Sequence, residues 1–286
     1  MIQRHKLYLL FTLFLCAIVS CEKPVIPVTE EKGNLTISVM QIEQMPFDGS
    51  MTRAELSQYF TRLNFAVYDS LGTRVKQTNQ LKDDKDFGTA VFQLPEGKYK
   101  VVVLGHSSNG NPAMTNYQKI QFKNDDGYTD TFLCFDSVEV SKTPTTLPAI
   151  PHRIVTLCRF VITDTIPSNV SRMRFLYTGG SGAFDATTGL GCVNSKQSEF
   201  FTVEPGSAST AFDLYTFLHD DKGTIHLQAT AYDEKDNVLN DREFDIPLKR
   251  RQITKVSGQY FNTSSSGLTI LIGLDPEWEG EEEISY

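Results

Sequence analysis

Tryptophan and cysteine are scarce in this chain of 286 residues, and each scarcity weighs against a class of protein. The single tryptophan, Trp278, weakens an interpretation as a glycan-stacking protein, although eleven tyrosines leave that function open. After Cys21 only Cys134, Cys158 and Cys192 remain, which allows at most one disulfide. Their number excludes a disulfide scaffold and their spacing matches no zinc site. We expect Cys134 and Cys158 to be small buried side chains within strands.

Recognisable catalytic motifs are also missing. The sequence contains no G-x-S-x-G, no H-E-x-x-H and no glycine-rich phosphate loop after a strand. His106 follows an apolar run and is more typical of a hydrogen-bonded structural residue than of a base. His219 with Asp220 and Asp221 is more typical of a solvated turn than of a metal site. We therefore expect no catalytic residue, no metal, no cofactor and no small-molecule substrate.

Positive charge is in deficit. The chain has 27 Lys and Arg against 35 Asp and Glu, and loss of Arg4 and Lys6 with residues 1–20 would leave a net charge of about −10. An acidic surface argues against nucleic acid as a partner and against electrostatic adhesion to anionic lipids.

A secretion signal is present at the start of the chain. Arg4 and Lys6 precede an apolar run, Leu7 to Val19, that is shorter than the roughly 20 residues of a transmembrane helix. The run ends in Ile18-Val19-Ser20-Cys21, which resembles a bacterial lipobox. We predict that residues 1–20 are removed and that Cys21 carries acyl chains, which hold the protein at the membrane. The alternative is an ordinary cleavable signal with an accidental cysteine, but an A-x-A-like site is missing.

After a proline-containing and charged tether, residues 21–33, the pattern alternates with period two almost everywhere. Leu35, Ile37 and Val39 begin the first predicted strand. The stretch 141–151 has three prolines and no periodic pattern, so it is the predicted domain boundary. Many short strands in two halves predict an all-β fold of two tandem β-sandwich domains, residues 34–146 and 147–286.

Two local signals stand out in the first half. Thr52-Arg53-Ala54-Glu55 is a capping box, and it predicts one short helix. Residues 87–94 and 99–104, joined by Pro95-Glu96-Gly97, predict a β-hairpin.

Several segments, in this order, resemble the FimB/Mfa2 family of fimbrial anchor lipoproteins of Bacteroides-type bacteria. They include Ser57 to Val67, Leu94 to Asn111, Arg153 to Asp185 with Arg159, and Leu248 to Phe261. The resemblance spans nearly the whole mature chain. It implies two transthyretin-like Greek-key sandwiches, a surface-exposed position at the cell outer membrane, and a structural role as the base of a type V pilus.

The same resemblance implies a fimbrial stalk subunit as partner, joined by strand complementation. The candidate strands are Leu35 to Ile42 and the last strand, in which Leu268, Ile270, Ile272 and Leu274 share one face. An ordinary closing strand explains the last pattern equally well. A surface glycan-binding lipoprotein and a tip or stalk pilin are the alternative functions.

Arg53 is the candidate protease-sensitive site. In stalk pilins of this system a surface protease cuts after an arginine and removes the first strand. Cutting after Arg53 would separate the domains from the lipid at Cys21, so an anchor is expected to keep the segment. The capping box offers a physical reason for resistance, since a helical arginine enters a protease cleft less readily than one in a loop.

Overall fold

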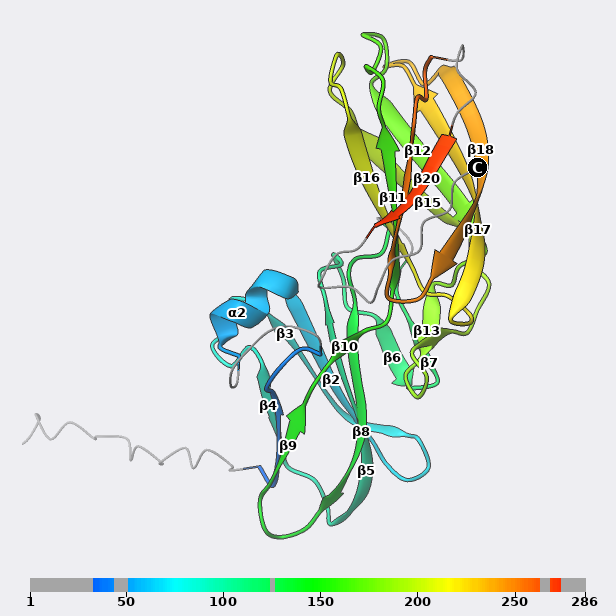
Figure 1. The fold of residues 1–286 in the computed structure, drawn as a ribbon. Coiled ribbons are helices and arrows are strands. Elements are labelled where there is room, and N and C mark those ends of the chain that lie inside the picture. Colours follow the sequence, from blue (N-terminus) through cyan, green and yellow to red (C-terminus); the bar gives the residue numbers. More distant parts are fainter. Residues whose placement is uncertain (1–32, 44–50, 124–126, 263–267, 274–286) are drawn as a thin grey trace, which may run out of the picture. The chain divides into compact units, whose positions relative to one another are not determined.

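The computed structural model of the chain describes residues 33–43, 51–123, 127–262 and 268–273 (Figure 1). These residues belong to one compact unit, and almost all of their regular structure is β-strand. The all-β class predicted from the period-two pattern is therefore confirmed. No helix in the described part is long and apolar enough to cross a membrane.

The first half of the chain forms two sheets around a shared apolar core. The smaller sheet has the order β4-β1-β9, with β1 at Leu35–Val39, β4 at Thr89–Phe92 and β9 at Thr145–Ala149. The larger sheet has the order β10-β8-β5-β2-β3; its strands are β2 (Arg62–Tyr68), β3 (Arg74–Leu81), β5 (Gly97–His106), β8 (Phe132–Val140) and β10 (His152–Arg153). Leu56 and Phe60, from helix α2 (Arg53–Tyr59) and its C-terminal cap, join this core.

The second half forms another pair of sheets. One has the order β16-β11-β19-β20; its strands are β11 (Thr156–Ile162), β16 (Thr210–Thr216), β19 (Ile253–Gly258) and β20 (Leu268–Gly273). The other has the order β15-β12-β17-β18; its strands are β12 (Arg172–Thr178), β15 (Gln197–Thr202), β17 (Lys222–Tyr232) and β18 (Val238–Lys249). Alternate side chains of both sheets meet in a core rich in aromatic rings, such as Phe160 and Phe175 at 5.4 Å between ring centroids.

A third core lies where the two halves meet. The small sheet β14-β13-β7-β6 joins β6 (Ala113–Asn116) and β7 (Lys119–Gln121) to β13 (Ala183–Asp185) and β14 (Leu190–Gly191). Phe122, Phe184 and Phe217 stack beside this sheet, with centroids 5.0 to 6.5 Å apart. Val102 and Leu104 of β5 face this third core, whereas Val101 and Val103 face the first. A four-residue apolar run is therefore buried on both sides.

The predicted hairpin 87–104 is wrong. β4 pairs with β1, from Leu35 opposite Phe92 to Ser38 opposite Thr89. β5 instead pairs with β2 and β8 in the other sheet. Pro95-Glu96-Gly97 thus carries the chain across the core from one sheet to the other. Turn chemistry reverses the chain in both arrangements, so the sequence did not distinguish a hairpin from this crossing.

The proline-rich stretch 141–151 also differs from its prediction, because it contains strand β9. Leu35 lies opposite Thr145 and Val39 opposite Ala149 in a parallel pairing. Pro148 is tolerated because β9 is an edge strand of its sheet. Strand pairing changes from the first pair of sheets to the second between β10 and β11, at residues 154–155.

Candidate functional site

The first strand, one of the predicted assembly elements, is the central strand of its sheet. β1 pairs antiparallel with β4 on one side and parallel with β9 on the other. Leu35 and Ile37 are fully buried, and Val39 is 4% exposed. Full burial of such side chains stabilises by about 1.5–3 kcal/mol each. The strand therefore completes the first core from within the chain.

The predicted lipid-attachment residue Cys21, the predicted signal 1–20 and most of the predicted tether lie outside the described residues. Within the described residues, regular structure begins at Leu35, close to the predicted start of the first domain at residue 34.

The capping box around Arg53 is confirmed. The Glu55 carboxylate accepts from the Thr52 backbone N–H at 2.6 Å, and the Thr52 hydroxyl accepts from the Glu55 N–H at 3.3 Å. The first of these bonds lowers the pKa of Glu55. Arg53 is the first helical residue, and Leu56, at 2% exposure, fixes the helix to the core. The backbone at the candidate protease site is therefore helical.

The candidate donor strand, β20, is already paired within its own sheet. It runs antiparallel to β19, from Ile253 opposite Gly273 to Gly258 opposite Leu268. Ile270 and Ile272 lie in this strand, whereas Leu274 falls outside the described residues. Within the described ranges no strand pairs with the other edge of β20. That edge therefore offers backbone N–H and C=O groups for strand addition.

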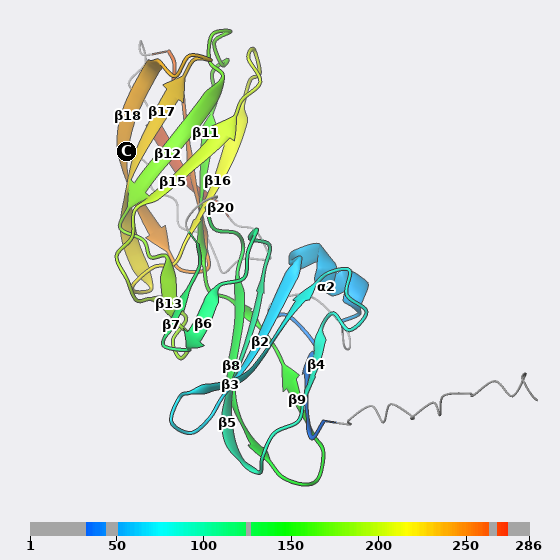
Figure 2. The same cartoon turned by 180° about the vertical axis from the view of Figure 1, so that it is seen from behind.

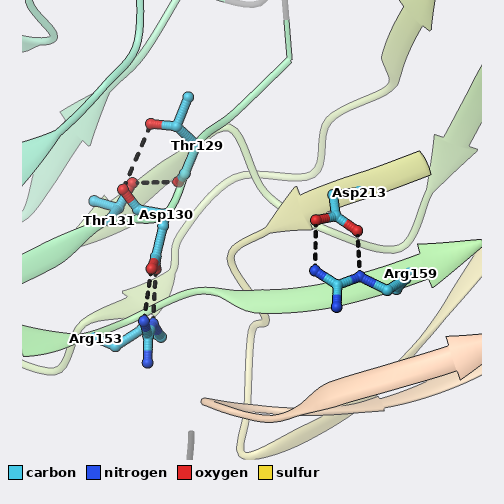
Figure 3. A network of polar contacts seen from close by, with 6 residues as sticks. All are labelled: Thr129, Asp130, Thr131, Arg153, Arg159 and Asp213. Atoms are coloured by element: carbon cyan, nitrogen blue, oxygen red, sulfur yellow. Dashed lines mark hydrogen bonds and ion pairs between the residues drawn. The ribbon is translucent and has the colours of Figure 1, made fainter. Parts of the chain in front are cut away.

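Two bidentate ion pairs flank the change from the first to the second pair of sheets (Figure 3). Arg153 of β10 donates from Nε and Nη2 to Asp130, both at 2.7 Å, and its guanidinium carbon lies 4.8 Å from the centre of the Phe132 ring. Arg159 of β11 donates in the same way to Asp213 of β16, at 2.7 and 2.8 Å. Fork-to-fork pairing satisfies both carboxylates, so these four charged groups are already engaged within the fold.

His106 is a structural residue. Its Nε2 lies 2.8 Å from Asn64 Oδ1, and its Nδ1 accepts from the Ser108 backbone N–H at 3.1 Å. Burial lowers the pKa of His106 to about 3, so the ring is neutral. His219 Nδ1 lies 2.9 Å from the Gly191 carbonyl oxygen. The described residues contain no cluster of three or more metal-ligating side chains.

A buried carboxyl group at Glu199 was missed by sequence reasoning. The Tyr177 hydroxyl lies 2.7 Å from Glu199 Oε1 and 2.9 Å from the Tyr215 carbonyl oxygen. Burial raises the pKa of Glu199 to about 7, although the bond from Tyr177 opposes the shift. Gly127 packs on Oε2 with a φ of 77°, and a β-carbon there would collide with the carboxylate. Hydrophobic periodicity cannot reveal an inward polar residue of this kind.

All three cysteines of the described part are free thiols. Cys158 is fully buried in β11, and burial raises the pKa of its thiol to about 12. Cys134 is half-buried in β8, and Cys192 is exposed. The prediction of buried strand cysteines holds fully for Cys158 and in part for Cys134.

Comparison with known proteins gives a family and a fold. The model of a family of unknown function, DUF6562, matches residues 27–285. No curated protein matches the chain. A solved structure of a candidate polysaccharide binding protein (DUF1812) from Bacteroides thetaiotaomicron VPI-5482 has a TM-score of 0.54 at 11% identity, over 84% of this chain and 95% of that one.

Two further solved structures match over most of their length. A candidate adhesin from Bacteroides ovatus has a TM-score of 0.53 at 10% identity, over 86% of this chain and 94% of that one. The fimbrial anchor protein Mfa2 from Porphyromonas gingivalis has a TM-score of 0.49 at 12% identity, over 88% and 99%. The matches with TM-scores of 0.54 and 0.53 show that this chain has the fold of the Bacteroides adhesin-like proteins, and they confirm the predicted resemblance at the level of the fold.

Proposed function

This chain belongs to the family of unknown function DUF6562, and from that premise we propose that it is a lipid-anchored structural protein of the outer membrane, the base subunit of a type V fimbria. The shared fold supports a cell-surface adhesive protein of the fimbrial kind. The lipobox-like sequence supports attachment through acyl chains on Cys21. The division into two transthyretin-like domains remains a prediction.

The observation that carries the proposal is the position of β1. This strand follows the tether directly and is the central strand of its sheet, between β4 and β9. A protein that keeps β1 stays joined to its lipid, and its first core needs no strand from a neighbour. A stalk subunit that lost β1 would have an open core and no link to the membrane. We therefore infer that the mature protein keeps β1, as a base subunit requires, whereas a stalk or tip subunit would lose it.

In this proposal the filament joins at the second pair of sheets. The unpaired edge of β20 is a place where a strand of the stalk subunit can add, with main-chain hydrogen bonds for affinity and alternate side-chain pockets for specificity. Because the net charge is negative, we do not expect electrostatic attraction to lipid head groups to hold the protein at the membrane. The acyl chains on Cys21 have this role in the proposal.

Two variants test the two ends of the protein separately. Cys21→Ala is expected to release the protein, with its filament partner, from washed outer membranes. Deletion of residues 268–286 is expected to leave the protein in the membrane but to abolish co-purification of the stalk subunit. Continued membrane attachment of Cys21→Ala after a high-salt wash would refute the anchor, and an intact filament on the deletion variant would refute the join at β20.

A further inference from the structure

An open groove of about 610 Å³ lies at the loop end of the second pair of sheets. The β11–β12, β15–β16 and β17–β18 connections form its walls, and they gather at the top of Figure 1 and again at the top of Figure 2. Polar side chains make up most of the lining: hydroxyl and amide groups at Ser168, Asn169, Ser171, Thr202 and Asn237, and charged groups at Asp233, Glu234 and Lys235. The volume is in the range of small-ligand sites, about 300–1,000 Å³.

An exposed aromatic ring stands beside this groove. Phe200 is 58% exposed and lies two residues before the lining residue Thr202, on the same face of β15. The Arg172 guanidinium carbon lies 5.3 Å from the centre of the Phe200 ring and 5.2 Å from that of Tyr232. The guanidinium therefore steadies the ring through cation–π contact while more than half of Phe200 stays open to solvent. A large apolar side chain left exposed in this way is informative about binding.

The charges near the groove are already paired or balanced. Arg172 Nη2 lies 2.5 Å from Asp236 Oδ1. The Asp233 carboxylate accepts from the side-chain amide of Asn237 and from the backbone N–H groups of Asn237 and Lys235, all at 2.8 Å, and these bonds lower its pKa. Two carboxylates, Asp233 and Glu234, line the groove with Lys235, and the nearby Arg172 guanidinium is neutralised by Asp236, so the groove offers no excess positive charge to phosphate or nucleic acid.

A protein partner fits this site less well than a polyol does. Two apolar residues of the lining, Val170 and Val203, are 1% and 6% exposed and belong to the core beneath, and the third, Pro205, is a single exposed ring. The groove therefore lacks the desolvated apolar pocket on which protein interfaces depend. A sugar instead presents many hydroxyl groups and an apolar C–H face, which match the hydroxyl and amide lining and the flat ring of Phe200.

We propose that this groove binds a neutral oligosaccharide, with Phe200 stacking on one sugar ring and Asn169 and Thr202 contacting hydroxyl groups. Phe200 and Thr202 lie in β15, in a different sheet from β1 and β20, so the proposed binding does not depend on the proposed anchor role. It would give the protein a glycan-binding activity in addition to its structural one.

Calorimetric titration of the mature protein with cellohexaose, maltohexaose, laminarihexaose and mannohexaose tests the proposal. At least one of these probes is expected to bind. Phe200→Ala is expected to weaken that binding by about tenfold, and Phe200→Tyr by less than about threefold, since tyrosine keeps the stacking ring. Asn169→Ala tests a second element of the groove, the β11–β12 connection. Leu71→Ala, an equally non-core substitution in the first pair of sheets at 89% exposure, is the control and should bind normally.

Absence of binding to all four probes would overturn the proposal. Equal affinity of wild type, Phe200→Ala and Asn169→Ala would overturn it as well. If Phe200→Ala instead abolished co-purification of a filament protein, with no sugar binding in wild type, the face would be a protein interface. Unchanged unfolding midpoints are expected for these exposed variants, so loss of binding would report the site itself.

Discussion

The side chain of Asn34 forms a two-way hydrogen bond with the backbone of Leu94, sixty residues further along the chain. Its Nδ2 donates to the Leu94 carbonyl oxygen at 2.8 Å, and its Oδ1 accepts from the Leu94 N–H at 2.9 Å. Nδ2 also donates to the Ser141 carbonyl oxygen at 3.3 Å. One buried amide therefore fixes the start of β1 to the crossing after β4 and to the loop before β9.

Asn34→Ala should lower the free energy of unfolding by about 2–3 kcal/mol, because it leaves the buried backbone groups of Leu94 without partners. Urea denaturation measures this loss. Asn116→Ala is the matched control, since that amide accepts only one exposed bond, from the Gln118 N–H at 2.9 Å. Equal destabilisation by the two variants would contradict the role assigned to Asn34.

Glu199 should make stability depend on pH. Its pKa is raised from 4.5 to about 7 in the folded protein, so the folded state holds a proton that the unfolded state has lost between these values. The protonated carboxyl group contributes fully to the free energy of unfolding below pH 4.5. This contribution disappears as the pH rises through about 7, which lowers the free energy of unfolding by about 3 kcal/mol.

Glu199→Gln should remove this dependence and keep the acceptor for the Tyr177 hydroxyl. Chemical denaturation of the wild type and of Glu199→Gln at about pH 5 and about pH 8 measures the pH dependence of the free energy of unfolding. Tyr128 and Tyr177, the titratable side chains facing Glu199, have pKa values raised above their ordinary range and stay neutral throughout this interval. An identical pH profile for the two proteins would refute the assignment.

The two ion pairs of Figure 3 should differ in how much each contributes to the free energy of unfolding. Arg153 is 5% exposed, so Arg153→Met leaves Asp130 without its partner and should cost about 3 kcal/mol. Arg159 is 40% exposed, and Arg159→Met should cost less than about 1 kcal/mol because solvent screens the pair with Asp213. Equilibrium unfolding compares the two variants directly. A larger loss for Arg159→Met would reverse this ranking.

The capping box should protect Arg53 from proteolysis. Thr52→Ala removes the side-chain cap at a cost of about 1 kcal/mol to the helix, which should raise local opening about fivefold. The rate at which trypsin releases a fragment beginning with Ala54 is the measurement. Ser57→Ala, which removes an exposed bond to the Ala54 carbonyl oxygen, is the control in the same helix. Unaltered cleavage of Thr52→Ala would show that the cap does not limit access.

The sequence predicts local features of this fold well. The alternation at Leu35, Ile37 and Val39, the capping box at Thr52 and Glu55, and the doubly buried run within β5 all depend on neighbours along the chain. Their physical signals are therefore contained in a few consecutive residues.

The features that sequence reasoning missed depend on contacts distant along the chain. Whether Pro95 begins a hairpin or a crossing is decided by the partner of β4, which is β1. The strand in the proline-rich stretch forms because β1 offers a parallel edge to Thr145–Ala149. Glu199 is buried because Gly127, seventy-two residues earlier in sequence, packs on it. No local pattern contains this information.

The N-terminus of the protein on cells tests the central claim most directly. Intact-mass measurement and N-terminal peptide mapping of protein extracted from outer membranes should find a chain that begins at acylated Cys21 and retains Leu35–Val39. The physical reason is that β1 is held by two neighbouring strands, by its buried side chains and by Asn34. A chain that begins mainly at Ala54 would contradict the account, because it would have lost both the lipid and the strand that completes the first core.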